Sequence, residues 1–576
     1  MLISLGHGGR LYFVGQERKA APAVAASDEA PEPGLLPVEQ AVPGYAEATA
    51  GFVETAPAST ERFGYLFDTA AGFPSQDKAA ALDALAAAMA EGAGGQDGTI
   101  PAIITYFGQF IDHDITANTN TEHVDAGLAI GAARIVPQDR AVVADKLRNM
   151  RKGSLQLDSL YGDGPIDTPE NRKAMAAMRD GDLMRVGATI PTDTRPDLPG
   201  PEAGEVRADL PRLGDLVGAG RPYASTADLP NELKPQGGDT RRWKRKAFIG
   251  DSRNDENLIV AQLHVGFLRF HNAVLRALGG GATFDKARQL VTWHYQWIVV
   301  NEYLPAICEA ETLRRVVTGG APLYKSFADR ISTGSPQSLP LPFEFSAAAF
   351  RFGHSMVRAR YDYNANFRRA TLKQLFDFTG NHPTSPIGGA GEERLPDNWI
   401  IDWARFTRSG TPGRNARRID THIAPPLFAM ANEGNAANGL FQRLAARNLR
   451  RGHLLNLPSA QGLIAALNAA GFGPIPELSR NVLERGHAGN AVRSGGFGSA
   501  TPLWFYVLKE AEEAGGGKLG PLGSRIVAET LVGLIVRDPN SYLNAPGGWD
   551  PDRSVKPGGI RVDSLLALLR VAGVAA

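Results

Sequence analysis

Cysteine is nearly absent from this sequence of 576 residues, which contains only Cys308. A single thiol excludes an intrachain disulfide framework, and it leaves the redox compartment undecided. An excess of charge of one sign is also missing, because Lys plus Arg and Asp plus Glu both number 61. This balance gives no indication of nucleic acid or of an anionic membrane as a partner.

Long hydrophobic runs are missing as well. No stretch approaches the roughly 18 uninterrupted apolar residues that indicate a transmembrane helix. The first 20 residues lack the charged start and long apolar run of a Sec signal peptide. We therefore expect a soluble protein without a transmembrane segment, either cytoplasmic or secreted by a non-Sec route. The sequence decides neither between these two locations nor the oligomeric state.

Two parts of the chain differ in composition. Residues 1–60 form an N-terminal extension that is partly rich in Ala and Pro and has too little apolar surface to order itself. Residues 61–576 show repeated helical periodicity and few alternating, strand-like patterns. We expect one large, mainly α domain over 61–576, with long irregular loops and little β-structure. The pattern predicts helices at 78–91, 100–115, 256–278, 284–308, 340–357, 395–406 and 502–514.

The densest group of unusual side chains lies inside the helical pattern at residues 108–114, with the sequence GQFIDHD. At 3.6 residues per turn, Gln109, Asp112 and His113 share one face, and Asp114 points about 100° away. One helix could therefore present a base to one pocket and a carboxylate to another. Taken alone, an Asp-His pair on a helix is more often a satisfied polar contact than a catalytic pair.

Three further groups of polar residues lie in apolar surroundings. They are Arg253, Glu256 and Asn257, expected on one helical face; Arg351 and His354, three apart in an apolar helix; and Asn448 and Arg451, ahead of Pro458. A lone histidine in such a helix is more often a packed core residue than a ligand, and an arginine at a helix start is usually a surface residue. No single group identifies a function.

Together and in this order, the four groups resemble the animal haem peroxidases, the peroxidase and cyclooxygenase superfamily, over roughly residues 60–540. GQFIDHD is similar to the distal-helix motif, GDSR with Glu256 to the distal-arginine segment, and FRFGH to the proximal-histidine segment. The 11-residue gap from Arg253 to His264 is also kept, and we interpret His264 itself as a core residue. The stretches 294–305 and 376–406 are similar to those of bacterial members.

The resemblance implies specific roles. His113 would be the distal acid/base that moves a proton between the two peroxide oxygens, because a neutral imidazole can both accept and return it. Arg253 would stabilise the charge that grows on the leaving oxygen, and Gln109 would hold water or a halide. His354 would bind the haem iron from the proximal side, and the neutral side-chain carbonyl of Asn448 would orient it.

The implied cofactor is haem b. Asp112 and Glu256 occupy the positions of the two carboxylates that form esters with haem in this family, and Arg351 or Arg451 could neutralise a haem propionate. Asn257 occupies the position of a sulfonium-forming methionine and cannot make that bond. Chloride is therefore an unlikely main donor, and hydrogen peroxide with bromide, iodide, thiocyanate or a small organic donor fits better.

The family also binds calcium beside the distal helix through hard oxygen ligands. Asp114 matches the first ligand position and Asp158 another, with Lys152 and Ser154 able to contribute partly through backbone carbonyls. Gln156 stands at the position that is usually acidic. This departure leaves the occupancy and the charge of the site open.

Two alternatives share the fold. Haem-dependent fatty-acid dioxygenases need a tyrosine three residues before the proximal histidine, and this chain has Arg351 there. A non-catalytic haem-binding or adhesion protein would be expected to have lost the distal residues, but His113, Arg253 and Gln109 are all present. The sequence does not name the physiological electron donor.

Overall fold

The computed structural model describes most of the chain after residue 60. The described residues are 61–73, 76–92, 96–116, 130–149, 151–162, 175–192, 208–229, 233–235, 240–332, 338–379, 394–407, 413–430, 439–440 and 442–575, with the backbone alone at 2–5 and 9–12. The remainder of the predicted N-terminal extension lies outside these ranges. The domain boundary after residue 60 therefore stays a prediction.

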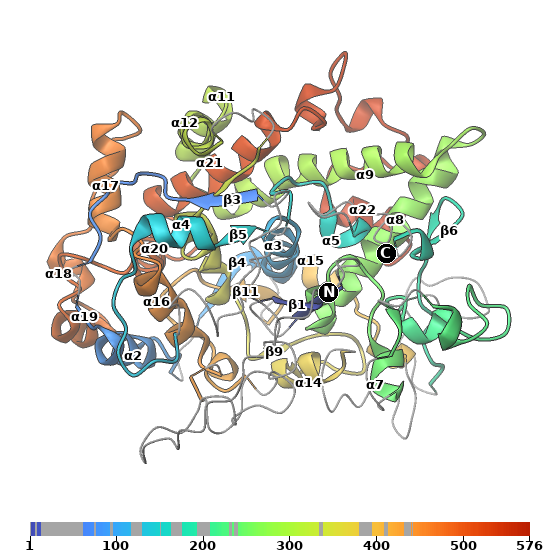
Figure 1. Cartoon of the computed structure of the whole chain (residues 1–576), viewed down its shortest axis with the longest axis horizontal. Helices are drawn as coiled ribbons and strands as arrows, with labels where there is room; N and C mark the ends of the chain where they lie inside the picture. The colour runs from blue at the N-terminus through green and yellow to red at the C-terminus, as the bar shows by residue number, and fades with distance from the viewer. Residues whose placement is uncertain are drawn as a thin grey trace, which may run out of the picture.

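The architecture is mainly helical, as the sequence predicts (Figure 1). The α-helices are α2 (Ala79–Ala88), α3 (Ala102–Ile115), α4 (Arg140–Lys146), α5 (Asp158–Tyr161), α7 (Thr240–Arg245), α8 (Leu258–Leu278), α9 (Phe284–Ile298), α10 (Leu304–Ile307), α11 (Ala310–Gly319), α12 (Pro322–Ile331), α13 (Phe343–Ser346), α14 (Leu372–Asp377), α15 (Ala404–Thr407), α16 (Leu444–Leu454), α17 (Ala460–Ala469), α18 (Arg480–Leu483), α19 (Gly489–Gly495), α20 (Leu503–Glu513), α21 (Pro521–Arg537) and α22 (Leu565–Val571). A π-helical segment, η6 (Val299–Tyr303), joins α9 to α10.

Short 3-10 helices connect many of these elements. They are η2 (Leu213–Leu216), η3 (Thr226–Asp228), η5 (Ser252–Asp255), η7 (Ala349–His354), η8 (Asp397–Trp399), η9 (Pro425–Phe428), η11 (Tyr542–Asn544), η12 (Pro551–Arg553) and η13 (Pro557–Gly559). This many short turns fits the Gly/Pro-rich connections in the sequence.

Strands are short and scattered. They are β1 (Leu2–Leu5), β2 (Gly9–Tyr12), β3 (Glu61–Gly64), β4 (Asp97–Pro101), β5 (Arg148–Asn149), β6 (Arg179–Asp180), β7 (Leu183–Met184), β8 (Leu341–Pro342), β9 (Arg360–Tyr361), β10 (Ala370–Thr371) and β11 (Asn415–Arg417). Within the described ranges the largest sheet has the order β5-β3-β8, with β3 antiparallel to β5 and parallel to β8. The other pairs, β1-β2, β4-β11, β6-β7 and β9-β10, are antiparallel.

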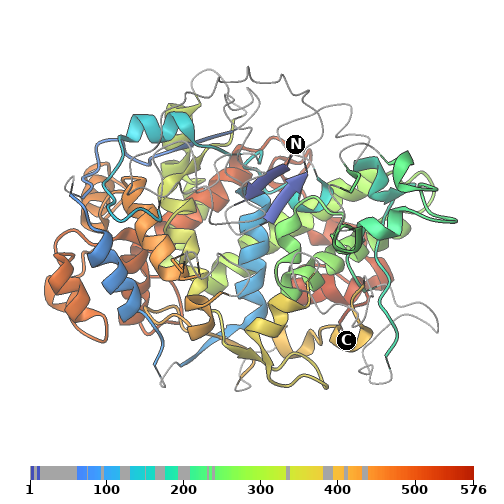
Figure 2. The same cartoon turned by 60° about the horizontal axis from the view of Figure 1, so that its bottom comes forward.

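Helix α3 lies at the centre of the molecule, with α8 on one side and the segments of α16 and α20 on the other (Figures 1 and 2). Of its 14 residues, all but Gln109 and Asp112 are buried, because the helix is apolar around most of its circumference. Phe110 stacks on Phe267 of α8 with ring centroids 4.8 Å apart. The central helix is therefore fixed on all sides, and its two less buried residues share one face.

Helix α8 is the one helix in the described part of the chain that is long and apolar enough to cross a membrane. However, 89% of its most apolar window is buried inside the protein. A core helix of a large domain is expected to have this composition.

The start of α8 differs from the prediction. The helix begins at Leu258, and the side chain of Asn257 caps it by accepting a hydrogen bond from the backbone N–H of Val260 at 3.0 Å. Arg253 lies before this cap in η5, and Glu256 ends that turn. The expectation that Arg253, Glu256 and Asn257 share a face of one helix is therefore wrong.

The segments 340–357 and 395–406 are also not continuous helices. The first divides into α13 and η7, and the second into the single turns η8 and α15. Periodicity does not indicate the helix ends at 343–346, because all of α13 is buried and its apolar residues do not define one face. Arg351 and His354 still share a side, because a 3-10 helix repeats every three residues.

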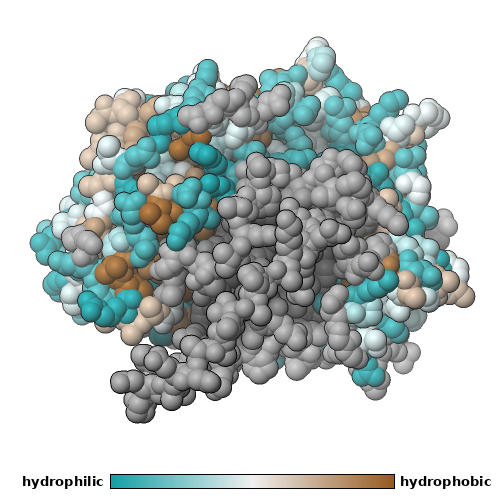
Figure 3. All heavy atoms as spheres, viewed as in Figure 1, coloured by the Kyte–Doolittle hydropathy of each residue, from teal (hydrophilic) through white to brown (hydrophobic). Residues whose placement is uncertain are grey.

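One hydrophobic core includes described residues from Phe63 to Ala575. On the face shown in Figure 3, the coloured surface is mostly hydrophilic, and hydrophobic side chains form separate small patches. Among the described residues, the large hydrophobic side chains that are exposed are Val136, Val142, Val317, Val536 and Leu543.

Candidate active site

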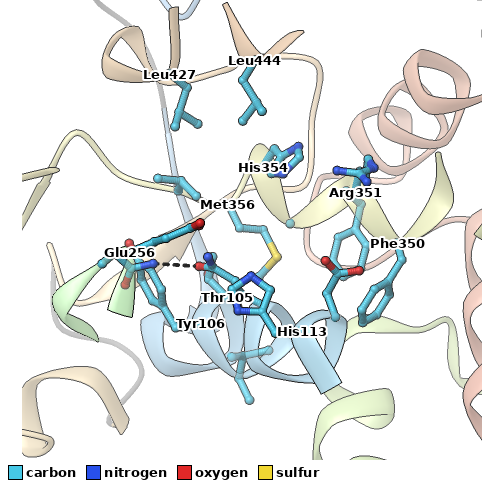
Figure 4. A pocket seen from close by; sticks show the side chains of 18 of the residues that line it. Thr105, Tyr106, His113, Glu256, Phe350, Arg351, His354, Met356, Leu427 and Leu444 are labelled. Atoms are coloured by element: carbon cyan, nitrogen blue, oxygen red, sulfur yellow. Dashed lines mark hydrogen bonds between the residues drawn. The ribbon is translucent and has the colours of Figure 1, made fainter. Parts of the chain in front are cut away.

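A cavity lies between α3 and η7. His113 lines it from α3, and His354 lines it from the last residue of η7 (Figure 4). The predicted residues that the structure also brings to its walls are Gln109, Asp112, Glu256 and Arg351. Most of the remaining lining is apolar, with Leu372, Phe376, Leu427 and Leu444 among it.

His113 is only 1% exposed, and its Nδ1 lies 2.8 Å from the side-chain oxygen of Asn254. Burial, with a further contribution from Arg253, lowers its pKa to about 4. The imidazole is therefore neutral near pH 7. Since the amide oxygen can only accept, Nδ1 carries the proton and Nε2 carries the lone pair.

Asn254 was not recognised from the sequence as a functional residue. Its side-chain nitrogen lies 2.9 Å from Nδ1 of His264 on α8. His264 was interpreted as a core residue, and its exposure of 0% agrees with that interpretation. The sequence contains one indication of a role for each residue: Asn254 directly follows Arg253, and His264 ends the 11-residue gap that begins at Arg253.

Gln109 accepts a hydrogen bond from the side chain of Asn257 at 3.0 Å. Asn257 thus has two tasks, because its oxygen caps α8 and its nitrogen orients Gln109. Both residues line the cavity. The sequence indicates only that Asn257 cannot form a sulfonium bond, and the structure shows that it also orients Gln109 and caps α8.

Arg253 is buried but is not among the residues that line the cavity. Its guanidinium forms an ion pair with Asp251 and donates to the backbone carbonyls of His113, at 3.0 Å, and Thr116, at 2.6 Å. In this arrangement Arg253 holds the C-terminal turn of α3 in place. Its direct contact with peroxide stays a prediction.

On the other wall, Nδ1 of His354 lies 2.8 Å from the side-chain nitrogen of Asn448, and the side-chain oxygen of Asn448 has no hydrogen-bond partner in the part of the chain that the structure describes. Turning this amide by 180° exchanges the two atoms. The oxygen then accepts from Nδ1–H, and the Nε2 lone pair of His354 is available for a metal. Desolvation, with Arg351 and Arg447, lowers the pKa of His354 to about 3, which favours the neutral ring that a metal needs.

Three arginines lie near this wall. Burial lowers the pKa of Arg351, and it lowers the pKa of Arg451 to about 10, while Asp112 acts in the opposite direction on both. Arg447, which is 1% exposed, was not predicted, and no sequence pattern distinguished it from other arginines of α16. Buried cations of this kind favour an anionic ligand.

The residues expected to bind calcium lie behind α3. Both carboxylate oxygens of Asp114 accept backbone N–H groups, from Leu157 at 3.1 Å and Ser159 at 3.2 Å. Burial and the nearby Asp158 raise the pKa of Asp114. Gln156 donates to Asp538 at 2.8 Å instead of approaching Asp114. No group of three His, Cys, Asp or Glu side chains suited to a metal occurs among the described residues, so the calcium ligands stay a prediction.

These residues fit haem. The cavity is largely apolar, a neutral histidine with a supporting amide stands on each of two walls, and buried guanidinium groups are present for acidic substituents. Asp112 and Glu256 also lie on the walls, and ester links from them to haem stay a prediction.

Comparison with known proteins agrees with this fit. Residues 214–383 match the animal haem peroxidase family. A peroxidase-like protein of Margaritifera margaritifera is 24% identical over 387 residues, which are 62% of this chain and 44% of that protein. The thyroid peroxidase of Homo sapiens is 32% identical over 262 residues, which are 43% of this chain and 25% of that protein. The chain thus spans less than half the length of these relatives.

Two solved structures share the fold. Peroxidase A from Dictyostelium discoideum superposes with a TM-score of 0.52 and 16% identity, covering 90% of this chain and 94% of that chain. A fatty acid alpha-dioxygenase from Oryza sativa gives a TM-score of 0.50 and 14% identity, covering 90% of this chain and 86% of that chain. At these identities the two matches establish the architecture alone.

Proposed function

We propose that the chain is a member of the animal haem peroxidase family, a haem peroxidase that reduces hydrogen peroxide and oxidises a small donor. The observation that carries this proposal is the state of His113. Its Nδ1 is held by Asn254, and its Nε2 is left as a base on the wall of the cavity that His354 also lines.

Haem, when bound, supplies an iron that binds peroxide and takes up its two oxidising equivalents. His113 accepts the proton of one peroxide oxygen at Nε2 and returns it to the other oxygen, which leaves as water. The low pKa of His113 keeps this nitrogen unprotonated before peroxide arrives. Arg253 holds the carbonyl of His113, so it fixes the backbone from which the base projects.

His354 would hold the iron through Nε2, with Nδ1–H donated to Asn448. Arg351 and Arg451 would neutralise the propionates, because burial lowers the pKa values of both cations and an anion beside them would offset that burial. We also propose ester links to haem from Asp112 and Glu256. Support for these links is limited to the position of both carboxylates on the cavity wall.

For the donor we propose bromide, iodide, thiocyanate or a small organic molecule. Asn257 has no sulfur for a sulfonium bond, and its amide is engaged by Gln109 and by the start of α8. Without that bond the haem should be a weaker oxidant, which disfavours chloride. Gln109, oriented by Asn257, is the side chain best placed to hold water or a halide near His113.

One observation favours a second function, a haem-dependent fatty-acid dioxygenase. Arg351 occupies the sequence position of the required tyrosine, but Tyr303 of η6 also lines the cavity. Tyr303 could therefore offer a phenol that the local motif lacks. Oxygen uptake with a fatty acid, abolished in Tyr303→Phe, would select this alternative.

The test is to load the protein with haem and record the Soret band before and after adding hydrogen peroxide. His113→Ala should keep the haem but slow the reaction with peroxide by about 10²- to 10⁴-fold, the usual contribution of a general acid/base. His354→Ala should lose stable haem. A Soret band in the wild type with no response to peroxide, or equal rates in wild type and His113→Ala, would contradict the proposal.

A further inference from the structure

Behind His113 lies a buried chain of polar side chains that reaches α8. We propose that Asn254 and His264 are positioning residues that determine which ring nitrogen of His113 carries the proton. The inference rests on the proposed function, because it assigns His113 the part of the base, and it adds two residues to the machinery around that base.

The chain has two short contacts. Nδ1 of His113 lies 2.8 Å from the side-chain oxygen of Asn254, and the side-chain nitrogen of Asn254 lies 2.9 Å from Nδ1 of His264. The three residues are 1%, 0% and 0% exposed. Water therefore does not compete for these bonds, and a polar chain buried this deeply is ordered by its own partners.

An amide gives the chain a direction. The oxygen of Asn254 can only accept, so His113 must donate from Nδ1, and the nitrogen of Asn254 can only donate, so His264 must accept at Nδ1. His113 is then left with a lone pair at Nε2. If the amide were reversed, His113 would carry its proton at Nε2 and could not take one from peroxide.

The backbone of Asn254 and the ring of His264 are both restrained. The backbone N–H of Asn254 donates to the carbonyl of Asp251 at 3.0 Å, and the Asp251 carboxylate is held between Arg151 and Arg253. Burial lowers the pKa of His264 to about 3, so its ring stays neutral and keeps a nitrogen that can accept from Asn254.

The remaining nitrogen of His264, Nε2, has no hydrogen-bond partner among the described residues. Among the described residues, the hydrogen bond of the His264 ring is therefore the one with Asn254. Although its sequence indicates a core residue, His264 contacts the side chain that orients His113.

The experiment compares four variants of the haem-loaded protein by stopped-flow spectroscopy. Asn254→Leu removes both contacts at similar size, Asn254→Asp keeps an acceptor for His113, and His264→Phe removes the partner that orients the amide. Asn272→Leu is the matched control, because Asn272 is a buried asparagine of α8 that bonds the backbone of Met184 at 2.7 and 2.9 Å. The readouts are the rate of hydrogen cyanide binding, which needs the same proton acceptor but no turnover, and the rate with peroxide.

Asn254→Leu should slow both reactions by about 10- to 100-fold, the usual effect of losing a group that orients a catalytic or ligating histidine. Asn254→Asp should stay near the wild-type rates, and His264→Phe should fall between the two. Asn272→Leu should unfold at a lower temperature while both rates stay unchanged.

The proposal is overturned if Asn254→Leu binds cyanide as fast as the wild type, or if Asn254→Asp is as slow as Asn254→Leu. It is also overturned if Asn272→Leu slows both reactions equally, since the effect would then be loss of packing. If Asn254→Leu does not fold, Asn254→Asp and His264→Phe carry the test. Slow cyanide binding in His264→Phe, in a protein that never reacts with peroxide, would reject the proposed function and keep this inference.

Discussion

The wall around His113, called the distal wall, and the wall around His354, called the proximal wall, differ in how their buried polar side chains are paired. On the distal wall the polar side chains nearest the base pair with each other: Arg253 pairs with Asp251, and His113 with Asn254. On the proximal wall positive charge accumulates, and burial lowers the pKa values of Arg351 and Arg451.

The difference indicates what each wall requires. The base on the distal wall is already held without a ligand, as expected of a base that must be ready before a small substrate arrives. The buried cations of the proximal wall favour an anionic ligand, as expected of a site that holds a cofactor with carboxylates. The predictions below test this contrast, from the largest expected effect to the smallest.

The largest effect should come from removing a proximal charge. Arg451→Met should weaken haem binding by about 2–5 kcal/mol, the usual cost of truncating one partner of a buried charge pair. Haem titration measures the loss. Haem binding to Arg451→Met that is as tight as binding to the wild type would show that the proximal wall does not need this cation to hold an anionic ligand.

The next effect concerns the amide behind the iron ligand. Asn448→Ala should slow the reaction with peroxide or speed haem loss by about 10- to 100-fold. Asn448→Asp should instead lower the iron reduction potential, since a carboxylate makes the bound imidazole a stronger donor. Spectroelectrochemistry measures the potential. An unchanged potential in Asn448→Asp would mean that Asn448 does not accept from His354.

A packing prediction concerns the distal helix. A Cβ at Gly108 would lie 2.5 Å from the hydroxyl oxygen of Tyr303. Gly108→Ala should therefore destabilise the protein by about 1–3 kcal/mol, the usual cost of overpacking. Adding Tyr303→Phe should recover part of this loss, because the colliding hydroxyl is removed. Chemical unfolding of the single and double variants provides the measurement, and equal stabilities of the two would contradict the contact.

Buried histidines should make the haem-free protein sensitive to acid. The pKa of His264 is lowered to about 3, so below pH 6.5 the unfolded chain binds a proton there that the folded chain does not. Stability should fall as the pH is lowered from 6.5 toward 4, by at most about 1.4 kcal/mol per pH unit for each such residue. His264→Phe should make this loss shallower.

His422 provides the control with the opposite sign. Its contact with Asp420 raises its pKa, so its stabilising effect is fully present below pH 6.5 and is lost as the pH rises through the raised value. His422→Gln should therefore lower the stability at acid pH by a constant amount and leave the slope between pH 6.5 and 4 unchanged. A slope that His264→Phe does not change, or that His422→Gln does change, would show that these histidines do not titrate as the structure indicates.

The smallest effect concerns calcium behind the distal wall. The raised pKa of Asp114 indicates that the pair with Asp158 holds a proton or needs a cation. If calcium binds, it should raise the unfolding temperature relative to EDTA, and more at pH 8 than at pH 6, because protons compete for the carboxylates. Magnesium is the control ion. No shift at either pH would remove calcium from the proposal.

The sequence determined the fold class and the ionisable side chains on the cavity walls that the proposed chemistry uses, which are His113, His354, Asp112, Glu256 and Arg351. The apolar periodicity of α3 and α8 predicts buried helices. The short motifs GQFIDHD and FRFGH contain the histidines and carboxylates whose chemistry can be recognised from a few neighbouring residues. The prediction failed at the start of α8 and in 340–357, because capping by Asn257 and burial on every side override a periodic pattern.

Only the tertiary structure decided the rest. Arg253 donates a hydrogen bond to the backbone of α3, and Asn254 contacts both His113 and His264. Tyr303 lines the cavity, and Arg447 lies close enough to lower the pKa of His354. Each of these depends on contacts between segments far apart in the chain, and local pattern contains no information about which buried partner a polar side chain will find. Local chemistry fixed which groups are present, and long-range packing decided what each group holds.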